Sequence, residues 1–167
     1  PGLVQVFARD PIVAIGEVVL EARQRIPALR KEIRGLRPLL EELEDAGNRI
    51  VGPPPDDGTY LEGGDVLVDL PYCFVGVGKH ASNMRGVEWL RSRLGESVTV
   101  VPVEVKMAGM VHLDTCMTLI GPQRGIICLE AVRHPLPPPL DSYDFVEVDV
   151  ATCRQAGVNV LVLDPRT

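Results

Sequence analysis

The motif Leu61-Glu62-Gly63-Gly64-Asp65 is the main indication of the fold, because a similar short motif occurs three times in the chain. The other two copies are Phe7-Ala8-Arg9-Asp10-Pro11 and Val111-His112-Leu113-Asp114-Thr115. Each copy introduces an apolar run, a turn and a second apolar run, and 52 residues separate Asp10 from Glu62 while 50 separate Glu62 from His112. A nearly constant period of this length predicts repeated supersecondary units. If the units surround an axis, two carboxylates and an imidazole meet there.

The composition indicates a globular protein. The chain has 167 residues, of which 46% are hydrophobic, and no apolar run approaches the roughly 20 residues of a membrane span. We therefore expect a cytoplasmic protein that binds no membrane. The net charge of −6, without a basic stripe, argues against nucleic-acid binding. Four widely spaced cysteines show no metal-site spacing: Cys73, Cys116, Cys128 and Cys153. Three of them lie in apolar runs and are expected to be buried free thiols.

Within each unit, apolar periodicity predicts the order strand, strand, helix, strand. The expected strands are 12–15, 18–20, 50–51, 65–68, 73–77, 98–103, 116–120, 125–129, 145–148 and 158–163. The expected helices are 31–45, one running to about residue 94 with Ser82 or Asn83 as its cap, and a short one near Thr152. Pro38 either kinks the first helix or marks its true start. The units span roughly 3–52, 60–105 and 110–164, and we expect the chain to be part of a longer polypeptide.

The three ordered phrases Phe-Ala-Arg-Asp-Pro, Leu-Glu-Gly-Gly-Asp-Val-Leu-Val and His-Leu-Asp-Thr resemble the guanidino-group-modifying enzymes. This superfamily includes arginine deiminase, dimethylarginine dimethylaminohydrolase and the amidinotransferases. The resemblance implies an α+β fold of the pentein type, a β/α propeller of five ββαβ modules with the active site on its axis. The present chain corresponds to about three of the five modules.

The resemblance also implies roles for individual residues. In these enzymes a Cys thiolate attacks the guanidinium carbon and forms an amidino-thioester. His112 matches the general acid and base, and Glu62 matches the carboxylate that orients it. Asp10 and Asp114 match the carboxylates that hold the guanidinium nitrogens. Arg30 resembles the cation that binds the substrate carboxylate, although the basic residues around it are equally typical of a solvated helix face. No metal or organic cofactor is expected.

One part of the resemblance is missing. The nucleophilic Cys of the family follows its last module, and no matching segment occurs before Thr167. Cys116 and Cys153 do not occupy that position, although 112, 114 and 116 would share one face if they lay on a strand. We expect a hydrolase of arginine or methylarginine. Two alternatives stay open: an amidinotransferase that moves the amidino group from arginine to an amine, and a non-catalytic guanidine-binding or assembly module. Open propeller edges would allow self-association.

Overall fold

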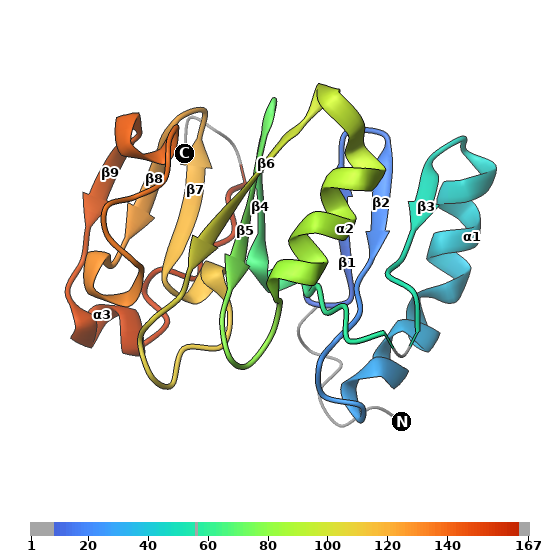
Figure 1. The fold of residues 1–167 in the computed structure, drawn as a ribbon, viewed down its shortest axis with the longest axis horizontal. Coiled ribbons are helices and arrows are strands. Elements are labelled where there is room, and N and C mark those ends of the chain that lie inside the picture. Colours follow the sequence, from blue (N-terminus) through green and yellow to red (C-terminus); the bar gives the residue numbers. More distant parts are fainter. Residues whose placement is uncertain (1–8, 56, 164–167) are drawn as a thin grey trace.

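The computed structural model describes residues 9–55 and 57–163. Phe7 and Ala8 of the first phrase, and the outermost residues of the first and third expected units, lie outside these ranges. Figure 1 shows three sheets side by side in chain order, with β7 of the third sheet and β1 of the first on the sides that face the middle sheet. Among the described residues, no helix is both long and apolar enough to cross a lipid bilayer.

The three sheets share one topology. The first contains β1 (Ile12–Ile15), β2 (Val18–Glu21) and β3 (Arg49–Val51). The second contains β4 (Val66–Asp69), β5 (Tyr72–Val77) and β6 (Thr99–Glu104), and the third contains β7 (Met117–Gly121), β8 (Arg124–Ile127) and β9 (Asp144–Glu147). In each sheet the first two strands form an antiparallel hairpin, and the third pairs in parallel with the second. The predicted repeat is therefore confirmed at the level of sheet topology.

The connections to the third strands differ between the sheets. In the first sheet the 3₁₀ segment η1 (Leu29–Leu36) leads into α1 (Arg37–Asp45), and Pro38 lies in the first turn of α1, where its missing N–H costs nothing. In the second sheet α2 (Met84–Leu94) begins after Asn83, whose side chain accepts a hydrogen bond from Gly86 N. In the third sheet two short 3₁₀ turns, η5 (Leu129–Ala131) and η6 (Leu140–Ser142), replace the helix, and α3 (Val150–Arg154) follows β9.

One predicted strand is wrong. Among the described residues, 158–163 form no strand, and Leu161 is 76% exposed. An apolar run becomes a strand only where a neighbouring strand offers N–H and C=O groups, and none of the described strands pairs with this segment.

Two buried clusters bind the three sheets into one body. One cluster joins the first and second sheets and includes Ile15, Leu20, Val75 and Leu90. The other joins the second and third sheets around the fully buried Phe74, whose ring meets that of Tyr143 edge to face at 5.6 Å. Because both clusters cross from one sheet to the next, they fix the positions of the loops that precede β4 and β7.

Candidate active site

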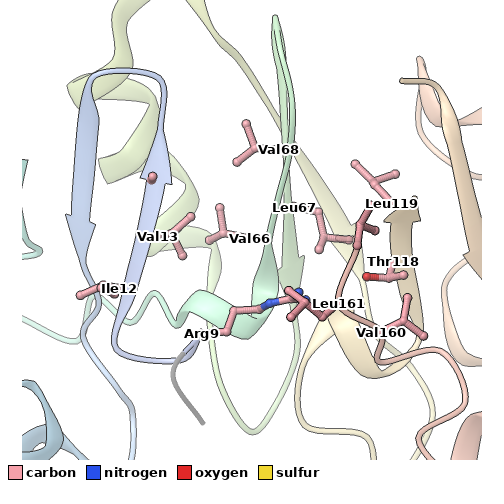
Figure 2. A pocket seen from close by; sticks show the side chains of 12 residues that line it. Arg9, Ile12, Val13, Val66, Leu67, Val68, Thr118, Leu119, Val160 and Leu161 are labelled. Atoms are coloured by element: carbon pink, nitrogen blue, oxygen red, sulfur yellow. The ribbon is translucent and has the colours of Figure 1, made fainter. Parts of the chain in front are cut away.

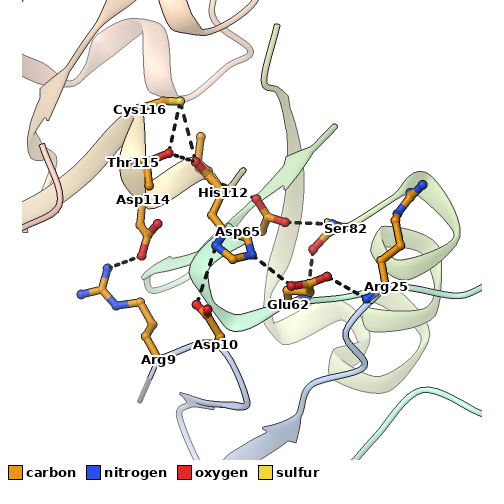
Figure 3. A network of polar contacts seen from close by, with 11 residues as sticks. Arg9, Asp10, Arg25, Glu62, Asp65, Ser82, His112, Asp114, Thr115 and Cys116 are labelled. Carbon is orange, nitrogen blue, oxygen red and sulfur yellow. Dashed lines mark hydrogen bonds and ion pairs between the residues drawn. The ribbon is translucent and has the colours of Figure 1, made fainter. Parts of the chain in front are cut away.

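The loops that begin the second and third units hold the central pair of side chains. Glu62 precedes the 3₁₀ turn η2 (Gly63–Asp65), and His112 precedes the equivalent turn η4 (Leu113–Thr115). Both residues have extended backbones, so both side chains leave their turns in the same way. His112 Nε2 lies 3.0 Å from Glu62 Oε2, and Glu62 is 3% exposed (Figure 3).

Asp10 approaches the same imidazole from the first unit. Its Oδ1 atom lies 3.7 Å from His112 Nδ1, which is too long for a direct hydrogen bond but close enough for a charge interaction. The contact depends on the main chain, since Gly63 N donates a hydrogen bond of 2.9 Å to Asp10 O. The three expected residues Asp10, Glu62 and His112 are therefore brought together from three separate sheets.

The charges in this cluster are strongly coupled. Burial by itself lowers the pKa of His112, but the hydrogen bond to Glu62 and the negative charges of Asp65, Asp10 and Glu62 outweigh burial and raise this pKa to about 9. Burial raises the pKa of Asp10, against the attraction of His112 and with the repulsion of Asp114. The His112 ring is thus protonated at neutral pH while it faces carboxylates on two sides.

Asp114 lies next to this cluster and has a partner that the sequence did not predict. Its Oδ2 atom lies 3.3 Å from Arg9 Nη1, and its Oδ1 atom is buried (Figure 3). Burial raises the pKa of Asp114, whereas the charges of His112 and Arg9 oppose the rise. A guanidinium group of the chain itself therefore occupies one edge of a carboxylate that was expected to hold a substrate guanidinium.

Arg30 is hydrogen-bonded to the neighbouring segment of Gln24 and Arg25 and not to these four residues. Its Nε atom donates to Gln24 O at 2.8 Å, Nη2 donates to Arg25 O at 3.1 Å, and its guanidinium lies 5.7 Å from the centre of the Tyr60 ring. Arg25, which the sequence analysis passed over, lies closer to the site. Its backbone N–H donates to Glu62 Oε1 at 2.8 Å, and its guanidinium lies 4.9 Å from the same Tyr60 ring. Only its place among the six cations from Arg23 to Arg37 could have marked it.

The four cysteines are buried free thiols. Because residues 113–115 form a 3₁₀ turn instead of a strand, Cys116 does not share a face with His112; its thiol lies 3.7 Å from His112 O, away from the carboxylates (Figure 3). Burial raises the pKa of Cys73 and Cys116 to about 12 and that of Cys153 to about 11. None of these three thiols forms a thiolate readily at neutral pH.

A cavity of about 500 Å³ lies between β1, β4 and β7, with Arg9 at its edge (Figure 2). Its walls carry mainly valine and leucine side chains from these strands and from residues 160–162. Such a lining does not suit a guanidinium. In the described ranges, no group of three or more His, Cys, Asp or Glu side chains is arranged to hold a metal ion.

The chain is similar in sequence to curated proteins. No protein-family model matches the chain. The chain is 26% identical over 164 residues to uncharacterized protein YkgA of Bacillus subtilis, an alignment that covers 98% of the chain and 54% of YkgA. It is 35% identical over 115 residues to the protein named "Putative hydrolase DDAH2" of Homo sapiens, covering 68% of the chain and 37% of that protein. The chain therefore spans about half, or less, of the length of these curated relatives.

Solved structures give the same fold. The amidinotransferase SxtG of Microseira wollei, from the saxitoxin biosynthetic pathway, superposes with a TM-score of 0.82 at 22% identity, over 94% of this chain and 55% of its own. The DDAH of Pseudomonas aeruginosa, as a C249S mutant in complex with citrulline, superposes with a TM-score of 0.76 at 15% identity, over 95% and 58%. The expected fold is confirmed: the chain folds like this amidinotransferase and this DDAH, as the resemblance to the pentein enzymes implies.

Proposed function

We propose that this chain supplies the acid–base and guanidinium-binding half of an enzyme that acts on arginine or a methylarginine, most simply by hydrolysis. The observation that carries the proposal is the single imidazole of His112, held between Glu62 at 3.0 Å and Asp10 at 3.7 Å. A delocalised guanidinium needs carboxylates to hold it and an acid to protonate its leaving amine. The cluster of Asp10, Glu62 and His112 contains both the carboxylates and the acid, in direct contact with each other.

The two imidazole nitrogens suit different tasks. Nε2 is engaged by Glu62 in a hydrogen bond, which orients the ring and favours its protonated form. Nδ1 has no such short contact with Asp10, so its proton is available for transfer. With a guanidinium bound at Asp10, Nδ1–H would protonate the departing amine. The neutral imidazole would then accept a proton from the incoming water or amine.

The covalent step that the superfamily resemblance implies needs a thiolate. A thiolate would attack the guanidinium carbon, the C–N bond to the leaving amine would break, and that amine would take the proton from His112. Burial holds the pKa of Cys73, Cys116 and Cys153 well above neutrality, so none of these three thiols suits the role. Cys128 is fully buried as well, so we propose that the thiolate comes from a cysteine other than the four of this sequence.

The substrate carboxylate needs a cation near the cluster. We propose Arg30 for this role, together with Arg25, because both guanidinium groups lie over the Tyr60 ring and Arg25 also contacts Glu62 through its backbone. Two guanidinium groups over one aromatic ring form a positively charged platform beside the acidic cluster. Cytoplasmic location and self-association through open sheet edges stay predictions from the sequence.

Binding of arginine to the chain is the direct test, measured by isothermal titration calorimetry. We expect saturable binding that weakens by about 1–3 kcal/mol in Asp10→Asn, since one charged contact is lost. Glu104→Gln is the matched control, because Glu104 is an exposed carboxylate paired with Arg133 on the outer surface. Absence of any saturable arginine binding to a folded wild-type chain would refute the proposal.

Product analysis separates the remaining functions. Because the covalent step needs the proposed thiolate, arginine is incubated with a form of the protein that includes it, with and without a primary amine acceptor. Hydrolysis gives citrulline and ammonia in both cases, whereas amidino transfer gives ornithine and the amidino-acceptor only when the acceptor is present. Saturable binding without either product would favour the non-catalytic binding or assembly module. His112→Asn should abolish either reaction, because no other described imidazole contacts the cluster.

A further inference from the structure

Asp65 is a buried carboxylate for which the proposed reaction has no role. It ends the turn η2 and is 2% exposed. Its Oδ2 atom accepts the backbone N–H of Ser82 at 2.9 Å, and its Oδ1 atom accepts the backbone N–H of Leu113, also at 2.9 Å. The carboxylate therefore connects two loops that come from different sheets.

Both loops lead directly to the catalytic pair. Leu113 follows His112 in the chain, so its bond to Asp65 fixes the backbone from which the imidazole projects. Ser82 is fully buried, and its Oγ atom accepts the backbone N–H of Glu62 at 2.8 Å. Together with the contact between His112 Nε2 and Glu62 Oε2, these hydrogen bonds and the main chain form a closed ring. Figure 3 shows the part of this ring that runs from Asp65 through Ser82 and Glu62 to His112.

The Asp65 carboxylate is closely packed against strand β5. A Cβ atom on Gly76 would lie 2.3 Å from Asp65 Oδ1 and 2.7 Å from Leu113 Cβ, so β5 must carry a glycine where it passes Asp65. Burial raises the pKa of Asp65 to about 6, against the attraction of His112 and the hydrogen bonds from Ser82 and Leu113. At neutral pH the group is ionised and faces an imidazolium.

We infer that Asp65, acting with Ser82, is a positioning residue that sets the alignment of Glu62 with His112 and supports the charged form of the imidazole. The inference rests on the proposed function, since it assigns a role within that same site. Asp65 touches no reacting atom. It acts through the backbones of the two residues that do, and through its charge.

The titration of His112 tests this role without any need for turnover. The chain has three histidines, His80, His112 and His134, whose ring carbon–proton signals can be followed by NMR across pH. In Asp65→Asn the midpoint of His112 should fall by about one pH unit or more, because one of the facing charges is lost. His80 and His134 should not move. The other charged groups that face His112, namely Asp10, Glu62 and Asp114, stay in place.

Asp69→Asn is the matched control, since Asp69 lies at the opposite end of β4 from η2. Its Oδ2 atom also accepts two hydrogen bonds from the third unit, from Tyr143 Oη at 2.7 Å and from Gln123 N at 2.9 Å, but it has no contact with the cluster. We expect Asp69→Asn to lower the unfolding free energy about as much as Asp65→Asn does, and to leave the titration midpoint of His112 unchanged. If both variants shift His112 equally, Asp65 is a merely structural link and the inference fails.

A milder variant keeps the test decisive if Asp65→Asn does not fold. Ser82→Ala keeps the Ser82 N–H for Asp65 but removes the acceptor of the Glu62 N–H, so the His112 midpoint should again fall. A folded Ser82→Ala protein with the wild-type midpoint would overturn the inference. Arginine binding is measured in parallel. A wild-type chain that binds no arginine, while the His112 shift is present, refutes the proposed function and leaves the role of Asp65 standing.

Discussion

The turns η2 and η4 have the same backbone and opposite chemistry. Each is a three-residue 3₁₀ turn that follows an extended residue and precedes an antiparallel hairpin. The extended residue is an acid, Glu62, in one turn and a base, His112, in the other. Because the two turns contact each other across the sheet junction, one repeated backbone places a proton donor against its acceptor.

Inside the turns the difference is one of space. Gly63 and Gly64 of η2 lie against other main chain and side chains of the site, whereas the same positions of η4 hold Leu113 and Asp114. At the third position Asp65 reaches across to η4, while the Thr115 hydroxyl donates back to His112 O within its own turn. The turn η2 is therefore closely packed, and η4 is fixed by the hydrogen bond that Asp65 of η2 accepts from it.

The largest expected effect comes from filling the crowded turn. A Cβ atom on Gly63 would lie 1.8 Å from Arg9 O and 2.9 Å from Arg9 C, and main chain cannot move aside as a flexible side chain can. We expect Gly63→Ala to lower the free energy of unfolding by about 3 kcal/mol or more, measured by urea denaturation. Gly121→Ala, with nothing within 4 Å of its added Cβ, should change it by less than about 0.5 kcal/mol. Equal effects of the two variants would show that η2 is not crowded.

The next effect depends on pH. The pKa of His112 is raised from 6.5 to about 9 in the folded protein, so its protonation stabilises the fold fully below pH 6.5, and this contribution is lost as pH rises through 9. We expect the wild type to lose roughly 2–3 kcal/mol of stability over this window relative to His112→Asn. Urea unfolding of both proteins at pH 6, 7.5 and 9 measures the difference. If the unfolding free energies of the two proteins change equally with pH, the carboxylates that face His112 do not stabilise its protonated form in the folded protein.

A smaller effect is expected within η4 itself. Thr115 Oγ1 donates to His112 O at 2.6 Å, and Thr115→Val keeps the shape of the side chain but removes this hydrogen bond. The loss should be about 1 kcal/mol of unfolding free energy. Thr99→Val, at an exposed position of β6, is the control and should be nearly neutral. A loss above about 3 kcal/mol would show that η4 depends on its local bond as much as η2 depends on close packing.

The smallest effect concerns Arg9. Its side chain is 36% exposed, so solvent screens its pair with Asp114, and Arg9→Gln should cost no more than about 1 kcal/mol. The same change should raise the pKa of Asp114 further, since the charge of Arg9 lowers it. Carboxyl ¹³C titration of Asp114 measures this shift. An unchanged Asp114 titration would show that the pair has no influence on η4.

Sequence reasoning succeeded where local pattern and long-range repeat agreed. The nine strands of the three sheets follow apolar runs that the sequence marks, and Asn83 caps α2 as one of the two expected residues. It failed at residues 158–163, whose apolar run has no pairing partner among the described strands. Cys116 received no role from the sequence, and the shared face considered for residues 112, 114 and 116 does not form, because residues 113–115 are a 3₁₀ turn. Arg30 stays a prediction, and the roles proposed for Arg25, Asp65 and Ser82 rest on contacts in space that the sequence does not mark.

The sequence by itself determined the repeat, the hairpins and which polar residue begins each unit, namely Asp10, Glu62 or His112. These features depend only on the period and the apolar pattern, which can be read along the chain. The tertiary structure decided which groups meet. Only packing of the sheets against each other sets Glu62 on Nε2 of His112, Asp10 near Nδ1, Arg9 on Asp114 and Asp65 between the two turns. These partners lie roughly 50 residues or more apart, and burial, which raises the cost of every unpaired charge, is what gives their pairing its chemical effect.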